Sequence, residues 1–282
     1  MVLCLSRLSY LGESANTLMP GIGRAMSIRQ ILLAIAGLGT LCTNLVVAQD
    51  KDKDNKTAHV WSYDGSHGPS HWGDLNPEFS ACKAGHQQSP IDISQHQKAD
   101  LPSIEFDYKR SPLHIIDNGH TVMINYAPGS FLRVGGKQYE LKQFHFHRPS
   151  EEKINGKTFE MEVHLVHADT DGKLAVVAIL LNKGSDNALV HELWNDLPKE
   201  KEEEEAPEQV QIDLTQLLPA NLGYYTFPGS LTTPPCSENV TWFVLKQPVT
   251  ITGTEIARFS SLYHNNARPV QPLDGRMVLE NK

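Results

Sequence analysis

The sequence predicts a mainly β protein: a single domain with a large, twisted, mostly antiparallel central sheet and a few short peripheral helices. From residue 104 onward the chain is dominated by short runs in which apolar and polar residues alternate, and this period of two is typical of strands. Dipeptides that favour tight hairpin turns separate the runs: Gly135-Gly136, Asn155-Gly156 and Asp171-Gly172. We expect strands at residues 122–126, 131–134, 141–147, 159–167 and 174–181.

Helical periodicity is confined to two stretches, residues 188–197 and 253–262. The charge run KEKEEEEAPEQ at residues 199–209 predicts a solvated loop or a frayed helix. The sequence contains no internal repeat and no second-domain boundary, so we assign residues 59–282 to one domain. The charged residues 49–58 before it form a linker.

The first 48 residues are typical of an export signal. Residues 31–38, ILLAIAGL, form an apolar run of signal-peptide length, with arginines before it and small residues at a cleavage position after it. The run is shorter than the roughly 20 residues of a spanning helix, so we expect no stable membrane span after cleavage. A signal would naturally begin at Met26, which makes residues 1–25 an upstream-start extension. An uncleaved anchor or a buried helix is the alternative.

Charge and cysteine content limit the classes of partner and bear on the cellular compartment that we expect. The formal net charge of −8 argues against a nucleic-acid partner, which calls for clustered Lys and Arg, and is compatible with a small substrate. Export predicts a periplasmic or secreted protein. Cys4 and Cys42 leave with the leader, so Cys82 and Cys236 remain as an even pair in an oxidising compartment, where two buried free thiols are the alternative.

Three histidines on two predicted strands form a candidate metal site. His145 and His147 are two residues apart in the alternating run LKQFHFH, so both imidazoles project from one face. A turn between the runs permits antiparallel pairing with MEVHLVH, which places His164 beside them. Three neutral imidazoles on rigid strands suit Zn2+, whose catalytic sites keep a fourth position for water. His167 differs in parity from His164 and should face away. The alternative to a metal site is that these are ordinary core or surface histidines.

Two polar residues are candidates to orient these histidines. A metal-bound histidine usually donates its other N–H to a fixed acceptor. Gln143 lies two residues before His145, and Glu162 lies two residues before His164, so each shares a strand face with a histidine. We expect both to act as acceptors, with ordinary polar sheet residues as the alternative.

Five motifs follow one another along the chain: QSPIDI at residues 88–93, DNGH at 117–120, QFHFH at 143–147, MEVHLVH at 161–167 and GSLTTPPCSENVTW at 229–242. Together they resemble those of the α-carbonic anhydrase family, in the family's order and in the form of its secreted bacterial members. The similarity runs from about residue 61 to residue 268. The resemblance implies reversible hydration of carbon dioxide to bicarbonate and a proton, by attack of zinc-bound hydroxide.

The resemblance also implies a role for each matching residue. The three histidines are the zinc ligands, Thr232 accepts a hydrogen bond from the zinc hydroxide, Glu151 orients Thr232, and His120 shuttles protons. Tyr63 and Asn118 match polar residues near the shuttle. The apolar wall beside carbon dioxide corresponds to Val166, Val176, Leu231, Val240 and Trp242, and the substrate pocket also includes Thr233. Cys82 and Cys236 match a disulfide of the secreted members.

Two positions depart from the family's pattern. Glu152 stands where relatives often have histidine, and Arg148 stands where many animal members have tryptophan. We expect neither to touch a metal ligand.

A proton shuttle is needed for kinetic reasons. An acid of pKa about 7 loses its proton to water at about 10³ per second if recapture is diffusion-limited, whereas carbonic anhydrase is known to turn over at about 10⁶ per second. A histidine, with a pKa near 6.5, can carry protons to buffer. For His120 the alternative is an exposed turn residue.

Two other classes of function compete with this interpretation. A cupin-like metal enzyme also uses an HxH pair followed by glutamate, but its second motif needs Pro-x-Gly and then histidine, which TTPPCSENVTW lacks. A binding or adhesion protein on the same scaffold typically loses ligand histidines, and all three are present here. The sequence does not set the oligomeric state; a homodimer is compatible with it.

Overall fold

The computed structural model describes residues 61–199 and 202–282. The expected leader, its extension and the charged linker lie outside the described residues. Among the helices of the described part, none is long and apolar enough to cross a membrane.

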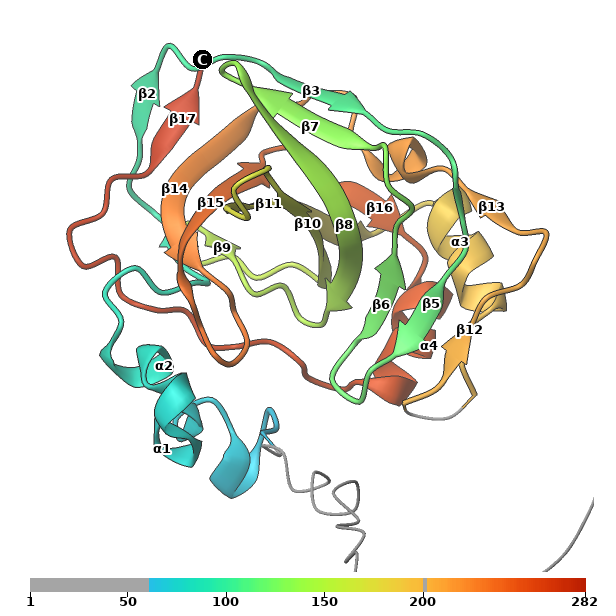
Figure 1. Ribbon diagram of the computed structural model, residues 1–282, viewed down its shortest axis with the longest axis horizontal. Helices are drawn as coiled ribbons and strands as arrows, with labels where there is room; N and C mark the ends of the chain where they lie inside the picture. The colour runs from blue at the N-terminus through green and yellow to red at the C-terminus, as the bar shows by residue number, and fades with distance from the viewer. Residues whose placement is uncertain (1–60, 200–201) are drawn as a thin grey trace, which may run out of the picture. The chain divides into compact units, whose positions relative to one another are not determined.

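One 13-stranded sheet dominates the described residues, so the mainly β prediction is confirmed. Its strands follow the order β12-β5-β6-β8-β10-β11-β15-β14-β17-β2, with β16 beside β11, β7 beside β8 and β3 beside β7 (Figure 1). Most neighbours are antiparallel, but β11 runs parallel to β15 and β16, and β17 runs parallel to β2, so the sheet is mixed. The strands are β2 (Gln97–Ala99), β3 (Ile104–Asp107), β5 (Ile115–Asp117), β6 (Val122–Asn125), β7 (Phe131–Val134), β8 (Lys137–His147), β10 (Met161–Ala168), β11 (Leu174–Lys183), β12 (Glu204–Glu205), β14 (Tyr224–Ser230), β15 (Glu238–Leu245), β16 (Val249–Ile251) and β17 (Leu279–Asn281).

Two small sheets and short helices complete the described fold. The small sheets pair β1 (Asp92–Ile93) with β9 (Lys153–Ile154), and β4 (Ser111–Pro112) with β13 (Gln211–Ile212). The α-helices are α1 (Trp72–Leu75), α2 (Ala81–Ala84), α3 (Ala188–Asn195) and α4 (Gly253–Leu262); the 3-10 helices are η2 (Gly65–His67), η3 (Pro77–Phe79) and η4 (Leu214–Leu217).

The predicted turn dipeptides explain two strand boundaries. Gly135 and Gly136 both have positive φ, 57° and 77°, and close a two-residue hairpin in which Val134 pairs with Lys137. β8 therefore begins four residues before the predicted start at residue 141. Asn155-Gly156 also forms a tight turn, but it closes the Ile154–Lys157 bridge inside the connection from β8 to β10. The antiparallel pairing of β8 with β10 was predicted correctly. The prediction that the Asn155-Gly156 turn joins these two strands directly was wrong.

The acidic run also differs from the prediction. Within it, Glu204 and Glu205 form β12 and pair with Ile116 and Ile115 of β5 at the edge of the sheet. Backbone pairing with an edge strand does not depend on side-chain polarity, so a charged segment can form it.

The two faces of the sheet differ in the side chains that they present. On one face, alternate residues such as Phe144, Phe146 and Val163 enter a large apolar core that also includes Trp194 of α3 and Phe259 of α4. Each fully buried side chain of this size stabilises the fold by about 1.5–3 kcal/mol. The intervening residues of β8 and β10 point to the other face, where a smaller apolar cluster lies. The large core holds the strands in place from one face, so side chains on the opposite face can form a site.

A disulfide ties the segment before the sheet to the loop after β14. Cys82 of α2 is bonded to Cys236, with 5.0 Å between their Cα atoms. The bond lies beside a small cluster that includes Trp72 and Phe79. This is the pairing that the family resemblance implied.

Candidate metal centre

Strand pairing brings the three histidines together. β8 and β10 are antiparallel with His145 directly opposite His164, and His147 lies two residues along β8 on the same face. The ring centroids of His147 and His164 are 4.5 Å apart, and His145 lies 5.0 Å from His147 and 5.4 Å from His164. One nitrogen from each ring lies within 4.8 Å of the others. His167 faces the core instead, where the Tyr108 hydroxyl lies 2.7 Å from its Nε2.

In two of the rings Nδ1 lies within hydrogen-bond distance of an acceptor, so Nε2 is the nitrogen that can bind a metal between the three rings. His145 Nδ1 lies 2.8 Å from Gln143 Oε1, as expected from the sequence. His147 Nδ1 lies 2.8 Å from the backbone carbonyl oxygen of Asn266, an acceptor that no motif indicated. A ring that donates from Nδ1 presents a lone pair at Nε2. His147 Nε2 is buried and has no hydrogen-bond partner, as expected of an atom that ligates a metal.

His164 is oriented the other way round, and here one expectation was wrong. Its Nε2 lies 3.7 Å from Glu162 Oε2, the predicted acceptor, and 3.4 Å from Glu152 Oε2. Glu162 Oε2 accepts the backbone N–H groups of Glu151 and Glu152 at 2.8 and 3.0 Å, and this turn carries the Glu152 side chain to His164. Glu152 therefore does touch a candidate ligand. Arg148 behaves as expected: its guanidinium donates to the backbone of His264.

Burial and charge set the protonation of the three rings. Burial and the neighbouring His164 lower the pKa of His145 to about 3, and burial lowers the pKa of His147 well below its ordinary value. Both rings are therefore neutral, as metal ligation requires. Burial would also lower the pKa of His164, but Glu152 and Glu162 raise it to about 10 through hydrogen bonding and charge.

An apolar surface adjoins the histidines on the same face. Val166 follows His164 by two residues on β10 and pairs with Val176, which pairs in turn with Trp242 of β15. The Trp242 ring lies 4.9 Å from that of His164. Val176, Val240 and Trp242 belong to one buried cluster, against which Val166 and Leu231 pack. Thr233 lies outside that cluster, in the loop, where its carbonyl accepts the N–H of Cys236 at 2.8 Å.

Known proteins share this sequence and architecture. Residues 67–282 match the family model of the eukaryotic-type carbonic anhydrases. The chain is 42% identical over 257 residues to a carbonic anhydrase of Nostoc sp., across 89% of this chain and 97% of that one. A carbonic anhydrase of Klebsiella pneumoniae is 44% identical over 226 residues, across 79% and 92%. The structure of the α-carbonic anhydrase from Thermovibrio ammonificans, in complex with sulfanilamide, superposes with a TM-score of 0.76 at 41% identity, across 78% and 99%.

The chain belongs to the α-carbonic anhydrase family. It is an enzyme, and the general activity of carbonic anhydrases is the hydration of carbon dioxide. This membership excludes the cupin-like alternative.

In this carbonic anhydrase, Glu151 lies next to the rings of His147 and His164, and the Thr232 side chain hydrogen-bonds to Glu151. Glu151 Oε2 lies 3.5 Å from His147 Nε2 and 3.8 Å from His164 Nδ1. Glu151 Oε1 accepts the backbone N–H of Arg268 at 2.7 Å. Burial raises the pKa of Glu151 to about 7, against the lowering effects of His164, of that N–H and of a hydrogen bond from the Thr232 side chain. The pairing of Glu151 with Thr232 is the one that the family resemblance implied.

The candidate shuttle residue lies on the turn between β5 and β6. The His120 ring stacks on Trp61, with centroids 3.7 Å apart and an interplanar angle of 8°. Asn118 Oδ1 accepts the backbone N–H groups of His120 and Thr121, so its side chain shapes the turn. Tyr63 contacts Trp61 edge-on, and burial followed by the charge of Glu151 raises its pKa well above the ordinary value. Trp61 was not singled out from the sequence as a partner for His120.

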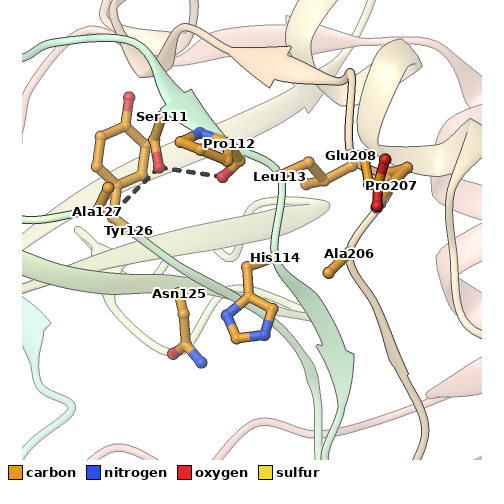
Figure 2. A pocket seen from close by; sticks show the side chains of 10 residues that line it. All are labelled: Ser111, Pro112, Leu113, His114, Asn125, Tyr126, Ala127, Ala206, Pro207 and Glu208. Carbon is orange, nitrogen blue, oxygen red and sulfur yellow. Dashed lines mark hydrogen bonds between the residues drawn. The ribbon is translucent and has the colours of Figure 1, made fainter.

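A separate hollow of about 310 Å³ is lined by residues of β4 and β6 and by residues 206–208 (Figure 2). His114 and Asn125 lie on one side of it, and Ala206, Pro207 and Glu208 on the other. None of the predicted site residues lines it. It is therefore distinct from the cluster of histidines.

Proposed function

We propose that this carbonic anhydrase holds Zn2+ with His145, His147 and His164 and hydrates carbon dioxide reversibly to bicarbonate and a proton. The convergence of three imidazole nitrogens beside an apolar surface carries the proposal. A zinc ion there would supply hydroxide at neutral pH, because in carbonic anhydrases it is known to lower the pKa of a bound water to about 7. The acceptors at Nδ1 of His145 and His147 support a fixed metal site.

Thr232 and Glu151 orient the nucleophile. A hydroxyl has one proton to donate. If Thr232 donates it to Glu151, only lone pairs remain on Thr232 Oγ1, so the hydroxyl accepts a hydrogen bond from the nucleophile. That nucleophile then keeps a lone pair directed at the substrate. Carbon dioxide is uncharged and apolar, so the surface formed by Val166, Val176 and Trp242 is a suitable host.

The proton leaves through His120. His120 lies on a turn and stacks on Trp61, which also contacts Tyr63, and this position supports the role. With His120→Ala, saturating turnover in weak buffer should fall toward the rate limit of about 10³ per second, because water alone then receives the proton. Added imidazole should restore turnover, and kcat/KM should change little. Wild-type turnover of the variant in weak buffer would remove His120 from the mechanism; His114→Ala is a control for loss of a surface histidine.

The metal requirement is tested on the intact enzyme. Stopped-flow hydration of carbon dioxide should be lost after prolonged treatment with a zinc chelator and restored by adding zinc alone. Retained activity in protein shown to be free of metal would overturn the proposal.

We further propose that the leader is removed and that the mature protein resides in the periplasm or the medium. N-terminal sequencing of the exported protein should find a start close to residue 49. The homodimer stays a prediction, tested by the molar mass in solution.

A further inference from the structure

Asn266 is a fully buried residue that joins two parts of the proposed site. Its side chain makes three hydrogen bonds. Oδ1 accepts the backbone N–H of Arg148 at 2.7 Å, and Nδ2 donates to the carbonyls of Phe146 at 2.9 Å and His120 at 3.1 Å. Its backbone carbonyl is a separate group, which serves His147 Nδ1.

The Asn266 side chain binds backbone groups of β8 and of the residue after it, beyond the point where β6 pairs with this strand. β6 pairs with β8 only as far as Met123 opposite His145. Beyond that point β6 makes no further backbone pair with β8, and the amide of Asn266 binds the carbonyl of Phe146 and the N–H of Arg148, which flank His147. An amide side chain presents a donor and an acceptor side by side, as a neighbouring strand would.

The third hydrogen bond reaches the proposed shuttle residue. The carbonyl that Asn266 binds is that of His120 itself, so one rigid side chain connects the backbone of the shuttle turn to the backbone on both sides of a candidate zinc ligand. The turn has other restraints, since Thr121 Oγ1 donates to Phe146 O and Tyr263 to Asp117. Asn266 binds the carbonyl of residue 120 itself, whereas these two hydrogen bonds are made by Thr121 and Asp117.

We propose that the side chain of Asn266 is a positioning residue for proton transfer, because it fixes the backbone of His120 relative to His147. This inference rests on the proposed function, in which His120 carries the proton. Catalysis is sensitive to placement: an error of about 1 Å can cost about a hundredfold in rate. The hydration step does not use His120, so loosening the turn should slow proton release and leave hydration itself intact.

The test separates these two steps in the zinc-loaded enzyme. Asn266→Ala removes the three side-chain bonds and keeps the backbone carbonyl at His147. In weak buffer we expect kcat to fall about tenfold, a fraction of the loss that misplacement can cause, with kcat/KM within about twofold of wild type and zinc content unchanged. Imidazole should restore most of kcat. Asn266→Ser, which keeps a polar group, should show the same pattern more weakly and serves if the alanine variant fails to fold.

A matched control comes from the same chain. Asn187 is also a buried asparagine with three side-chain hydrogen bonds: it accepts from Leu189 N and Val190 N, and donates to Gln216 O. It caps α3, away from the histidines. Asn187→Ala should lower stability but leave kcat in weak buffer unchanged.

Three outcomes would overturn the inference. The first is an Asn266→Ala or Asn266→Ser enzyme with wild-type kcat in weak buffer. The second is a parallel fall of kcat and kcat/KM that imidazole does not rescue, which would show a structural role. The third is an equal loss of kcat in Asn187→Ala. If wild type hydrates carbon dioxide and His120→Ala shows the rescued loss, failure of the Asn266 variants leaves the proposed function standing. If wild type lacks zinc-dependent hydration, the proposed function fails first.

Discussion

At the scale of single residues, the candidate centre is defined by which nitrogen of each histidine is engaged. His145 and His147 have an acceptor at Nδ1, whereas His164 has carboxylates at Nε2. The acceptors of His145 and His147 each fix one tautomer and one ring orientation, so they prepare these two rings to bind a metal before the metal arrives. The acceptors should therefore matter for zinc affinity even though they do not touch the ion.

Gln143 offers the cleanest test of this point. Gln143→Ala removes the acceptor of His145 without adding charge, and it should weaken zinc binding by about 10–100-fold. The measurement is chelator competition at equilibrium. Gln138→Ala changes an exposed glutamine on the same strand and should leave zinc affinity unchanged. Equal affinities for the Gln143 variant and wild type would contradict the assigned role.

Residue-level prediction worked where periodicity alone fixes position. Gln143 was predictable because residues two apart on a strand share a face. The carbonyl of Asn266 was not, since it is 119 residues from His147 in the chain and a backbone group leaves no sequence signal. Glu152 was missed because its direction depends on how the Glu162 carboxylate folds the preceding turn.

At the scale of elements, β10 serves both faces of the sheet. His164 belongs to the site, whereas His167 is fully buried against the core with Tyr108. Burial lowers the pKa of His167 to about 4, although hydrogen bonds with backbone carbonyls oppose the shift. Between its ordinary pKa of 6.5 and about 4, the unfolded chain binds a proton at this position that the folded chain excludes. Stability from neutral His167 is thus lost as pH falls through this window.

The variant His167→Gln tests this linkage. Glutamine can still bond to Tyr108 but does not titrate. Between pH 6.5 and 4, the unfolding free energy of wild type should fall more steeply than that of the variant, by up to about 3 kcal/mol in total. Urea unfolding of both metal-free proteins across this range measures the difference. Parallel pH profiles would show that His167 does not contribute.

Element-level prediction was most successful for hairpin-bounded strands and capped helices. β7 and α4 have the predicted bounds, since a Gly-Gly turn follows one and a Thr252–Glu255 capping box begins the other. The parallel neighbours of β11 were not predictable, because this strand is buried on both faces and its apolar run does not reveal partners or direction.

At the scale of the whole chain, the disulfide links parts that are distant in sequence. Cys82 and Cys236 are 154 residues apart, so the bond should stabilise the fold by about 5 kcal/mol in the chain-entropy model. The mature protein, denatured without reductant, should show no free thiols in a thiol titration, and reduction should lower its melting temperature. Two free thiols per chain would contradict the bond.

The central claim is that three histidines on two strands hold the zinc that hydrates carbon dioxide. The most direct test measures zinc content and hydration rate on the same samples of wild type, His164→Ala and His167→Gln. Wild type and His167→Gln should contain one zinc per chain and be active. His164→Ala should lose both zinc and activity, because two imidazoles leave the site incomplete. Stoichiometric zinc with full activity in His164→Ala would contradict the account.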